Sequence, residues 1–182
     1  MKHYTLLLLL IGLALAGTGQ SQAATSTDMD FMIGEFDRRE RLRNPDGSWG
    51  PWQRGEWIAG YIMDGRGVLD ETHNFESGVR TTNVRIFDEL GGTWKVNWFK
   101  TPLYSTLVAE GGSEGEEVVF LNPENLDRWV FYDITPDSYR WRQERIIGGS
   151  YLSVFEIECT RRQDIASNAT AGIRLTSLIP QS

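Results

Sequence analysis

The chain has 182 residues, and its 25 acidic residues outweigh its 18 basic residues to give a formal net charge of -7 at pH 7. Because affinity for nucleic acid depends on clustered Lys and Arg side chains, this balance argues against a nucleic-acid partner. Cys159 is the single cysteine of the sequence, which excludes an internal disulfide.

The N-terminus has the pattern of an export signal. Lys2 precedes an unbroken apolar run over residues 6–16, and residues 17–23 are small or polar. This run is shorter than the roughly 20 apolar residues that a membrane-spanning helix needs. We expect residues 1–23 to be a signal peptide and Ala24 to begin a mature protein exported to the periplasm or beyond, without a membrane anchor. Loss of Lys2 would change the net charge from -7 to -8.

From residue 36 onward, short runs of aromatic and β-branched residues alternate with turn signals. Helical periodicity is almost absent, which predicts about ten strands. Gly111-Gly112 and residues 133–138 are among the expected turns. The expected strands cover residues 36–42, 52–63, 68–75, 79–87, 93–99, 104–110, 118–121, 128–134, 139–146 and 151–161.

The short connections favour consecutive antiparallel hairpins over the long crossovers that parallel strands require. Closure of such a meander removes the exposed strand edges, so an all-β, up-and-down barrel is favoured over a sandwich. The expected organisation is one domain over residues 28–162, followed by a loose tail over residues 163–182 that is small and polar at its start.

Several segments of the sequence form a recognisable set of local patterns: residues 31–36, 55–57, 63–65, 94, 98, 133–144 and 156–162. Together they resemble an uncharacterised bacterial family of lipocalin-like barrels, usually described as a domain of unknown function. The resemblance covers most of residues 31–162, and its most specific part is residues 134–144. It implies a calycin-type barrel and no established activity. Phe36 stands where tryptophan is usual in that family, and the loop 145–151 is shorter and lacks a terminal tryptophan.

The residue content of the chain excludes several kinds of catalytic and metal site. After signal removal, His73 is the only histidine and Cys159 the only cysteine, which excludes a multi-histidine metal site and a His/Cys zinc cluster. Carboxylate-only metal sites remain possible. The sequence contains no nucleophile elbow, phosphate-binding loop or dinucleotide fingerprint. We expect no metal and no cofactor, with haem held by His73 as a minor alternative.

His73 and Glu71 are the candidate catalytic residues. Alternation places Leu69, Glu71, His73 and Phe75 on one face of their strand, and the apolar ends of this set predict that it faces the barrel interior. Because Glu71 and His73 are two positions apart on the strand, their side chains would lie about 7 Å from each other and could transfer protons. The alternatives are a satisfied polar pair or a strand that faces the other way.

The candidate ligand-binding residues are aromatic side chains on alternating strand positions, together with one arginine. Large aromatics that line a barrel produce an apolar cavity with polar groups, unless they fill the barrel completely. The predicted set is Trp57, Trp98, Tyr139, Trp141 and Arg145.

The strand that carries three of these residues can face either way. With Tyr139 and Trp141 inside, Arg145 would lie at the pocket mouth, and Arg140, Arg142 and Glu144 would form an outer ion-pair row. The reverse arrangement would bury Arg142 and Glu144. We favour the first arrangement.

The leading functional hypothesis is an exported barrel that binds a small, partly apolar molecule. One alternative is an acid-base enzyme, an isomerase, lyase or hydrolase, that uses Glu71 and His73 in the same cavity. The other is a filled barrel with a structural or interaction role in the cell envelope.

Overall fold

The computed structural model describes residues 24–102 and 105–163. The predicted signal peptide, and the predicted tail from residue 164 onward, lie outside these ranges. No helix within the described ranges is both long and apolar enough to cross a membrane.

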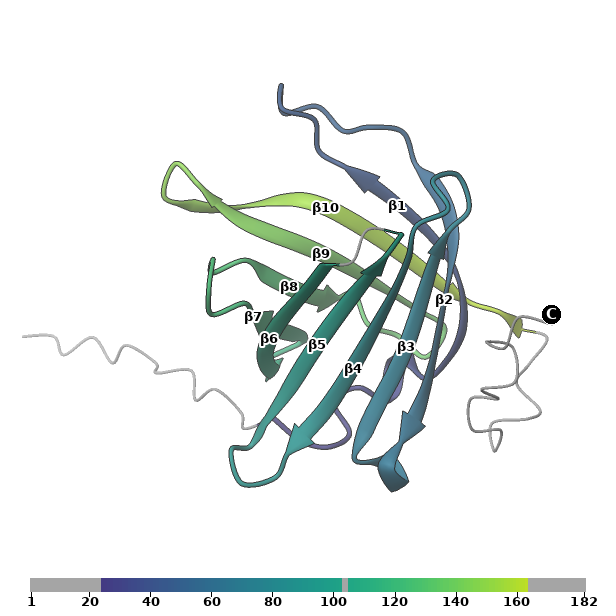
Figure 1. The fold of residues 1–182 in the computed structure, drawn as a ribbon, viewed down its shortest axis with the longest axis vertical. Coiled ribbons are helices and arrows are strands. Elements are labelled where there is room, and N and C mark those ends of the chain that lie inside the picture. Colours follow the sequence, from purple (N-terminus) through teal and green to yellow (C-terminus); the bar gives the residue numbers. More distant parts are fainter. Residues whose placement is uncertain (1–23, 103–104, 164–182) are drawn as a thin grey trace, which may run out of the picture.

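The described residues form a closed antiparallel barrel in which each strand pairs with its sequence neighbour and the first strand pairs with the last (Figure 1). The all-β barrel prediction is confirmed, and every expected strand overlaps an observed one. The strands are β1 (Gly34–Leu42), β2 (Gln53–Ile62), β3 (Gly67–Asn74), β4 (Arg80–Asp88), β5 (Thr93–Thr101), β6 (Ser105–Glu114), β7 (Glu117–Leu121), β8 (Arg128–Tyr132), β9 (Ser138–Ile147) and β10 (Ser150–Arg161).

The expected turn at Gly111-Gly112 is wrong. Both glycines lie inside β6, and the chain turns after it at Gly115, where φ is +67°. A Cβ atom at Gly111 would collide with the backbone carbonyl oxygen of Val119 on β7. This glycine therefore permits a close approach of two strands rather than a reversal of the chain.

One end of the barrel is closed by the segment that precedes β1. This segment contains the short 3₁₀ helix η1 (Asp30–Met32), and the side chains of Met29 and Met32 are fully buried. Phe31 packs edge-on against Phe131 and Tyr139, with ring centroids 5.4 and 5.2 Å apart. The purple segment in Figure 1 lies at the end of the barrel that carries the β2–β3 and β4–β5 turns.

Hydrogen bonds from the barrel wall hold this closing segment in place. Trp94 Nε1 on β5 donates to the carbonyl oxygen of Thr25 at 2.9 Å. Arg161 at the end of β10 donates from Nη1 to the Ile33 carbonyl at 2.7 Å and from Nη2 to the Phe31 carbonyl at 3.0 Å. The closed end is therefore an integral part of the barrel.

Strand β10 contains an irregularity that shifts which of its residues point into the barrel. Its pairing with β9 shifts register between Ser153 and Phe155, as expected for a β-bulge. From Phe155 onward the inward positions continue through Ile157 and Cys159. Cys159 is a buried free thiol, as its alternation with these two residues predicts.

Candidate functional site

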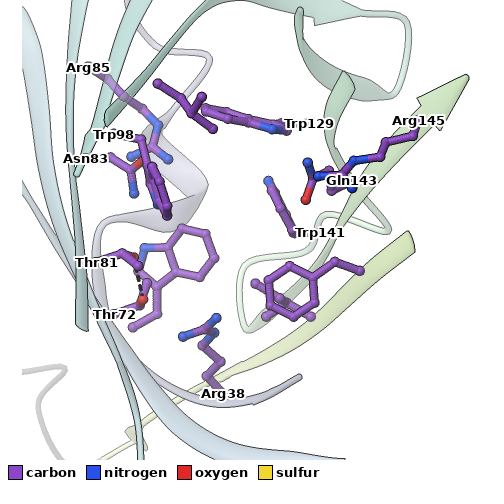
Figure 2. Close-up of a pocket in the computed structure, with 14 residues that line it drawn as sticks. Arg38, Thr72, Thr81, Asn83, Arg85, Trp98, Trp129, Trp141, Gln143 and Arg145 are labelled. Carbon is purple, nitrogen blue, oxygen red and sulfur yellow. Dashed lines mark hydrogen bonds between the residues drawn. The ribbon is translucent and has the colours of Figure 1, made fainter. Parts of the chain in front are cut away.

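A cavity of about 230 Å³ lies inside the barrel, beyond the layer of side chains that packs on the closing segment. Figure 2 shows its labelled residues arranged around an open space. The described residues that line it are Arg38, Trp57, Thr72, Thr81, Asn83, Arg85, Trp98, Leu107, Trp129, Trp141, Gln143, Arg145, Phe155 and Ile157.

Indole rings form much of the cavity wall. Trp57, Trp98, Trp129 and Trp141 come from β2, β5, β8 and β9, so the wall is aromatic on several sides. Trp141 packs edge-on against Phe155 of β10, with ring centroids 5.6 Å apart. Rings held in this way offer large, rigid apolar surfaces and leave the indole N–H groups as polar contacts.

Arg85 is the most deeply buried charge on the wall. Its guanidinium forms an ion pair with Asp70 on the neighbouring strand β3, and almost no water reaches either side chain. Asn83 Nδ2 donates to the other Asp70 oxygen at 2.7 Å. Burial lowers the pKa of Arg85 to about 9, and the guanidinium remains protonated at pH 7.

Arg38 on β1 is a second buried arginine, and it forms an ion pair with Glu40 two positions along the same strand. Asn74 Nδ2 donates to the same carboxylate at 2.6 Å. Burial lowers the pKa of Arg38, while the nearby Glu40 carboxylate opposes this change.

Arg145 lies at the other end of the cavity, and its side chain is 56% exposed. Its Nε donates to Asp127 at 3.0 Å, and Gln143 Nε2 donates to the same carboxylate oxygen at 2.7 Å. Figure 2 shows Arg145 and Gln143 across the open space from Arg85 and Asn83. Arg145 therefore lies at the mouth, as expected from the favoured orientation of β9.

Arg38 Nε, Arg85 Nε and Trp57 Nε1 belong to lining residues but are themselves buried, and within the described ranges they have no hydrogen-bond acceptor. A buried donor without an acceptor costs about 1–3 kcal/mol. These three atoms expose almost no surface to the cavity. The acids that pair with the arginines, Asp70 and Glu40, are not among the residues that line the cavity, so the wall carries arginine without acid.

The structure brings four of the five predicted binding residues together. Trp57, Trp98, Trp141 and Arg145 line the cavity. Tyr139 also points inward, but it packs beneath the cavity against Phe36 and is 1% exposed. Burial raises the pKa of Tyr139 well above its usual value, so its hydroxyl is neutral at pH 7.

The predicted inward face of β3 is wrong. Val68, Asp70, Thr72 and Asn74 are the buried set, which places Glu71 and His73 on the outside of the barrel. His73 Nδ1 lies 3.7 Å from Glu56 Oε1 on β2. The error arose because Leu69 and Phe75 made the outer face look apolar, whereas the inner face has polar groups that pair across strands.

This orientation removes the basis for two alternatives. Glu71 and His73 cannot act on a molecule in the cavity, and His73 cannot be the axial ligand of a haem bound there. Within the described ranges, no group of three His, Cys, Asp or Glu side chains could hold a metal ion.

Sequence reasoning missed the deep polar groups of the cavity, Arg38, Asn83 and Arg85. A weak signal was present, because Phe36, Arg38 and Glu40 alternate on β1, and Asn83, Arg85 and Phe87 alternate on β4. Charged residues at such positions are ordinarily assigned to solvent, and only the pairing of β3 with β4 reveals the compensating acid.

No family model and no curated protein matches this chain. Among solved structures, Rv2717c from M. tuberculosis superposes with a TM-score of 0.50 at 10% identity, over 78% of this chain and 100% of that one. The likeness is one of fold alone. A protein of unknown function from the DUF3598 family of Nostoc punctiforme matches over the same shares at 9% identity, with a TM-score of 0.26.

Proposed function

We propose that this protein is an exported, divergent lipocalin-like barrel that binds a small, partly apolar molecule in its cavity. The observation that carries the proposal is the cavity of about 230 Å³, which combines indole walls with arginine side chains and has no acidic side chain among its described lining residues. Ligand sites are usually concave, largely apolar and equipped with a few polar groups that orient the ligand. Export is supported by the sequence pattern of residues 1–23.

Binding fits the described residues better than the two alternatives do. A filled barrel would leave no space beside Trp57, Trp98 and Trp141, yet these residues border the cavity. For catalysis, the candidate pair Glu71 and His73 lies on the outer face of β3. Ligand binding requires neither residue, so we expect His73→Ala to leave binding unchanged.

Obstruction of the cavity tests the proposal directly. Leu107 lines the cavity, whereas its neighbour Val108 on β6 is 43% exposed on the outer face. Leu107→Trp adds bulk to the cavity and should abolish binding, and Val108→Trp adds the same bulk outside and should preserve it. The measurement is native mass spectrometry and absorbance of each protein purified from its native host, which detect a co-purifying molecule.

A bound small molecule on the wild type and on Val108→Trp, but not on Leu107→Trp, would support the proposal. Retention of that molecule by a well-folded Leu107→Trp variant would contradict it, because the ligand would then lie elsewhere.

A further inference from the structure

The size of the cavity limits what it can enclose. An apolar cavity of about 150 Å³ accommodates one benzene ring. The volume of about 230 Å³ therefore corresponds to a single ring with a short substituent. Indoles on several sides of this space suit the faces and edges of an aromatic ring.

The charges on the cavity wall limit the chemistry of the substituent. Arg38, Arg85 and Arg145 line the cavity, and no acidic side chain is among the described lining residues. Each of these arginines forms an ion pair with an acid that does not line the cavity. The pairs are Arg38 with Glu40, Arg85 with Asp70 and Arg145 with Asp127. A ligand thus meets guanidinium groups whose orientation is already fixed, which favours an anionic acceptor.

Two of the three lining arginines, Arg38 and Arg85, lie at the deep end of the cavity. The guanidinium of Arg38 lies 5.8 Å from the Trp57 ring, and that of Arg85 lies 5.9 Å from the Phe131 ring. The rings of Trp57 and Phe131 are themselves 6.0 Å apart, and both pack near Tyr139 beneath the cavity. Arg145, in contrast, is at the exposed mouth and already donates to Asp127.

We propose that the ligand is a single-ring aromatic carboxylate that enters acid end first. Its carboxylate lies against the guanidinium groups of Arg38 and Arg85, and its ring lies between Trp98, Trp129 and Trp141. This inference rests on the proposed binding function and specifies the class of molecule bound.

The test compares two probes that differ in charge. The probes are 4-fluorophenylacetate and its neutral counterpart 2-(4-fluorophenyl)ethanol, and ¹⁹F NMR titration of the purified protein measures the Kd of each. Charge-assisted hydrogen bonds to these guanidinium groups should make the Kd of the carboxylate at least about tenfold lower. Equal affinities would overturn the carboxylate assignment, and no binding of either probe would overturn the single-ring aromatic ligand. The binding function itself is tested separately by the Leu107→Trp and Val108→Trp comparison.

Variants locate the anion. Asp70→Asn/Arg85→Gln removes both charges of the deep pair, so no unpaired buried charge remains. We expect it to lose most of the preference for the carboxylate while keeping its affinity for the alcohol. Arg140→Gln, on the outer face of β9, is the matched control and should behave as the wild type.

A second deep variant, Arg38→Gln/Glu40→Gln, gives an independent measurement if the first does not fold, and the same loss of preference is expected. The proposal is overturned if folded deep variants keep the full preference, or if Arg145→Gln alone removes it. In the latter case the anion would bind at the mouth.

Discussion

At the scale of single residues, the most consequential interaction is the ion pair of Arg85 and Asp70. Their side chains are 4% and 0% exposed. A buried pair of this kind contributes little net stability, because desolvation of both charges offsets their attraction. Loss of one partner is strongly destabilising, because the other charge then remains buried without a counter-charge.

Asp70→Ala should therefore lower the free energy of unfolding by about 3–5 kcal/mol. Urea denaturation followed by tryptophan fluorescence measures this change. Glu110→Ala removes the exposed partner of Lys95 and should cost less than about 1 kcal/mol. Similar losses for the two variants would show that the Arg85 guanidinium gains access to water once Asp70 is absent.

At the scale of elements, β1 combines three structural tasks. Its inner face supplies Phe36 to the closed end and Arg38 to the cavity. On its outer face, Arg41 donates from Nε and Nη2 to Glu156 of the paired strand β10, at 2.9 and 2.6 Å.

The outer face of β9 carries the expected row of Arg140, Arg142 and Glu144, in which Arg142 Nε lies 2.6 Å from Glu144 Oε1. These outer pairs fix the strand neighbours more than they add stability.

The link between β10 and the closing segment depends on the planar shape of one guanidinium. Arg161 donates to the carbonyl oxygens of Ile33, Phe31 and Pro136 and lies 4.5 Å above the Phe36 ring. An ammonium group cannot reproduce this fork. Arg161→Lys should cost about 1–3 kcal/mol of unfolding free energy and raise hydrogen exchange at residues 24–33.

Arg140→Lys, at an exposed ion pair, is the control and should change neither quantity. Unchanged exchange over residues 24–33 in Arg161→Lys would mean that the packing of Met29 and Met32 alone holds the segment.

At the scale of the whole molecule, closure makes the barrel one cooperative unit, because β1 pairs with both β2 and β10. Buried ionisable groups then titrate together with unfolding. Burial raises the pKa of Cys159 to about 12 and that of Tyr139 well above its usual value, while it lowers that of Arg85 to about 9.

Above pH 9, these pKa shifts change the free energy of unfolding in opposite directions. The thiol and the phenol remain protonated in the folded state but ionise in the unfolded state, so stability falls as pH rises. The lowered pKa of Arg85 acts in the opposite direction, so its contribution rises with pH. The pKa of Tyr61 is also raised, to about 12, so the falling groups outnumber the rising one and stability falls between pH 10 and 12.

Urea denaturation at a series of alkaline pH values measures this slope. Cys159→Ala removes one falling group and should make the slope shallower by about 1.4 kcal/mol per pH unit in the same window. A slope unchanged by that substitution would contradict the assigned role of the thiol.

The sequence by itself determined the features that depend on short-range patterns. Runs of β-branched and aromatic residues between turn signals predicted the strands closely, because turn chemistry and strand periodicity are local properties. The same alternation correctly placed Tyr139 and Trp141 inside, since the opposite face of β9 carries Arg140, Arg142 and Glu144.

Only the tertiary structure decided the orientation of β3 and the polar composition of the cavity. Leu69 and Phe75 make the outer face of this segment the more apolar one, so periodicity selected the wrong face. Asp70 is tolerated inside because Arg85 and Asn83 on β4 meet it across the sheet, and that compensation exists only once the strands are paired in register. The deep arginines of the cavity therefore became visible only when burial and pairing were both known.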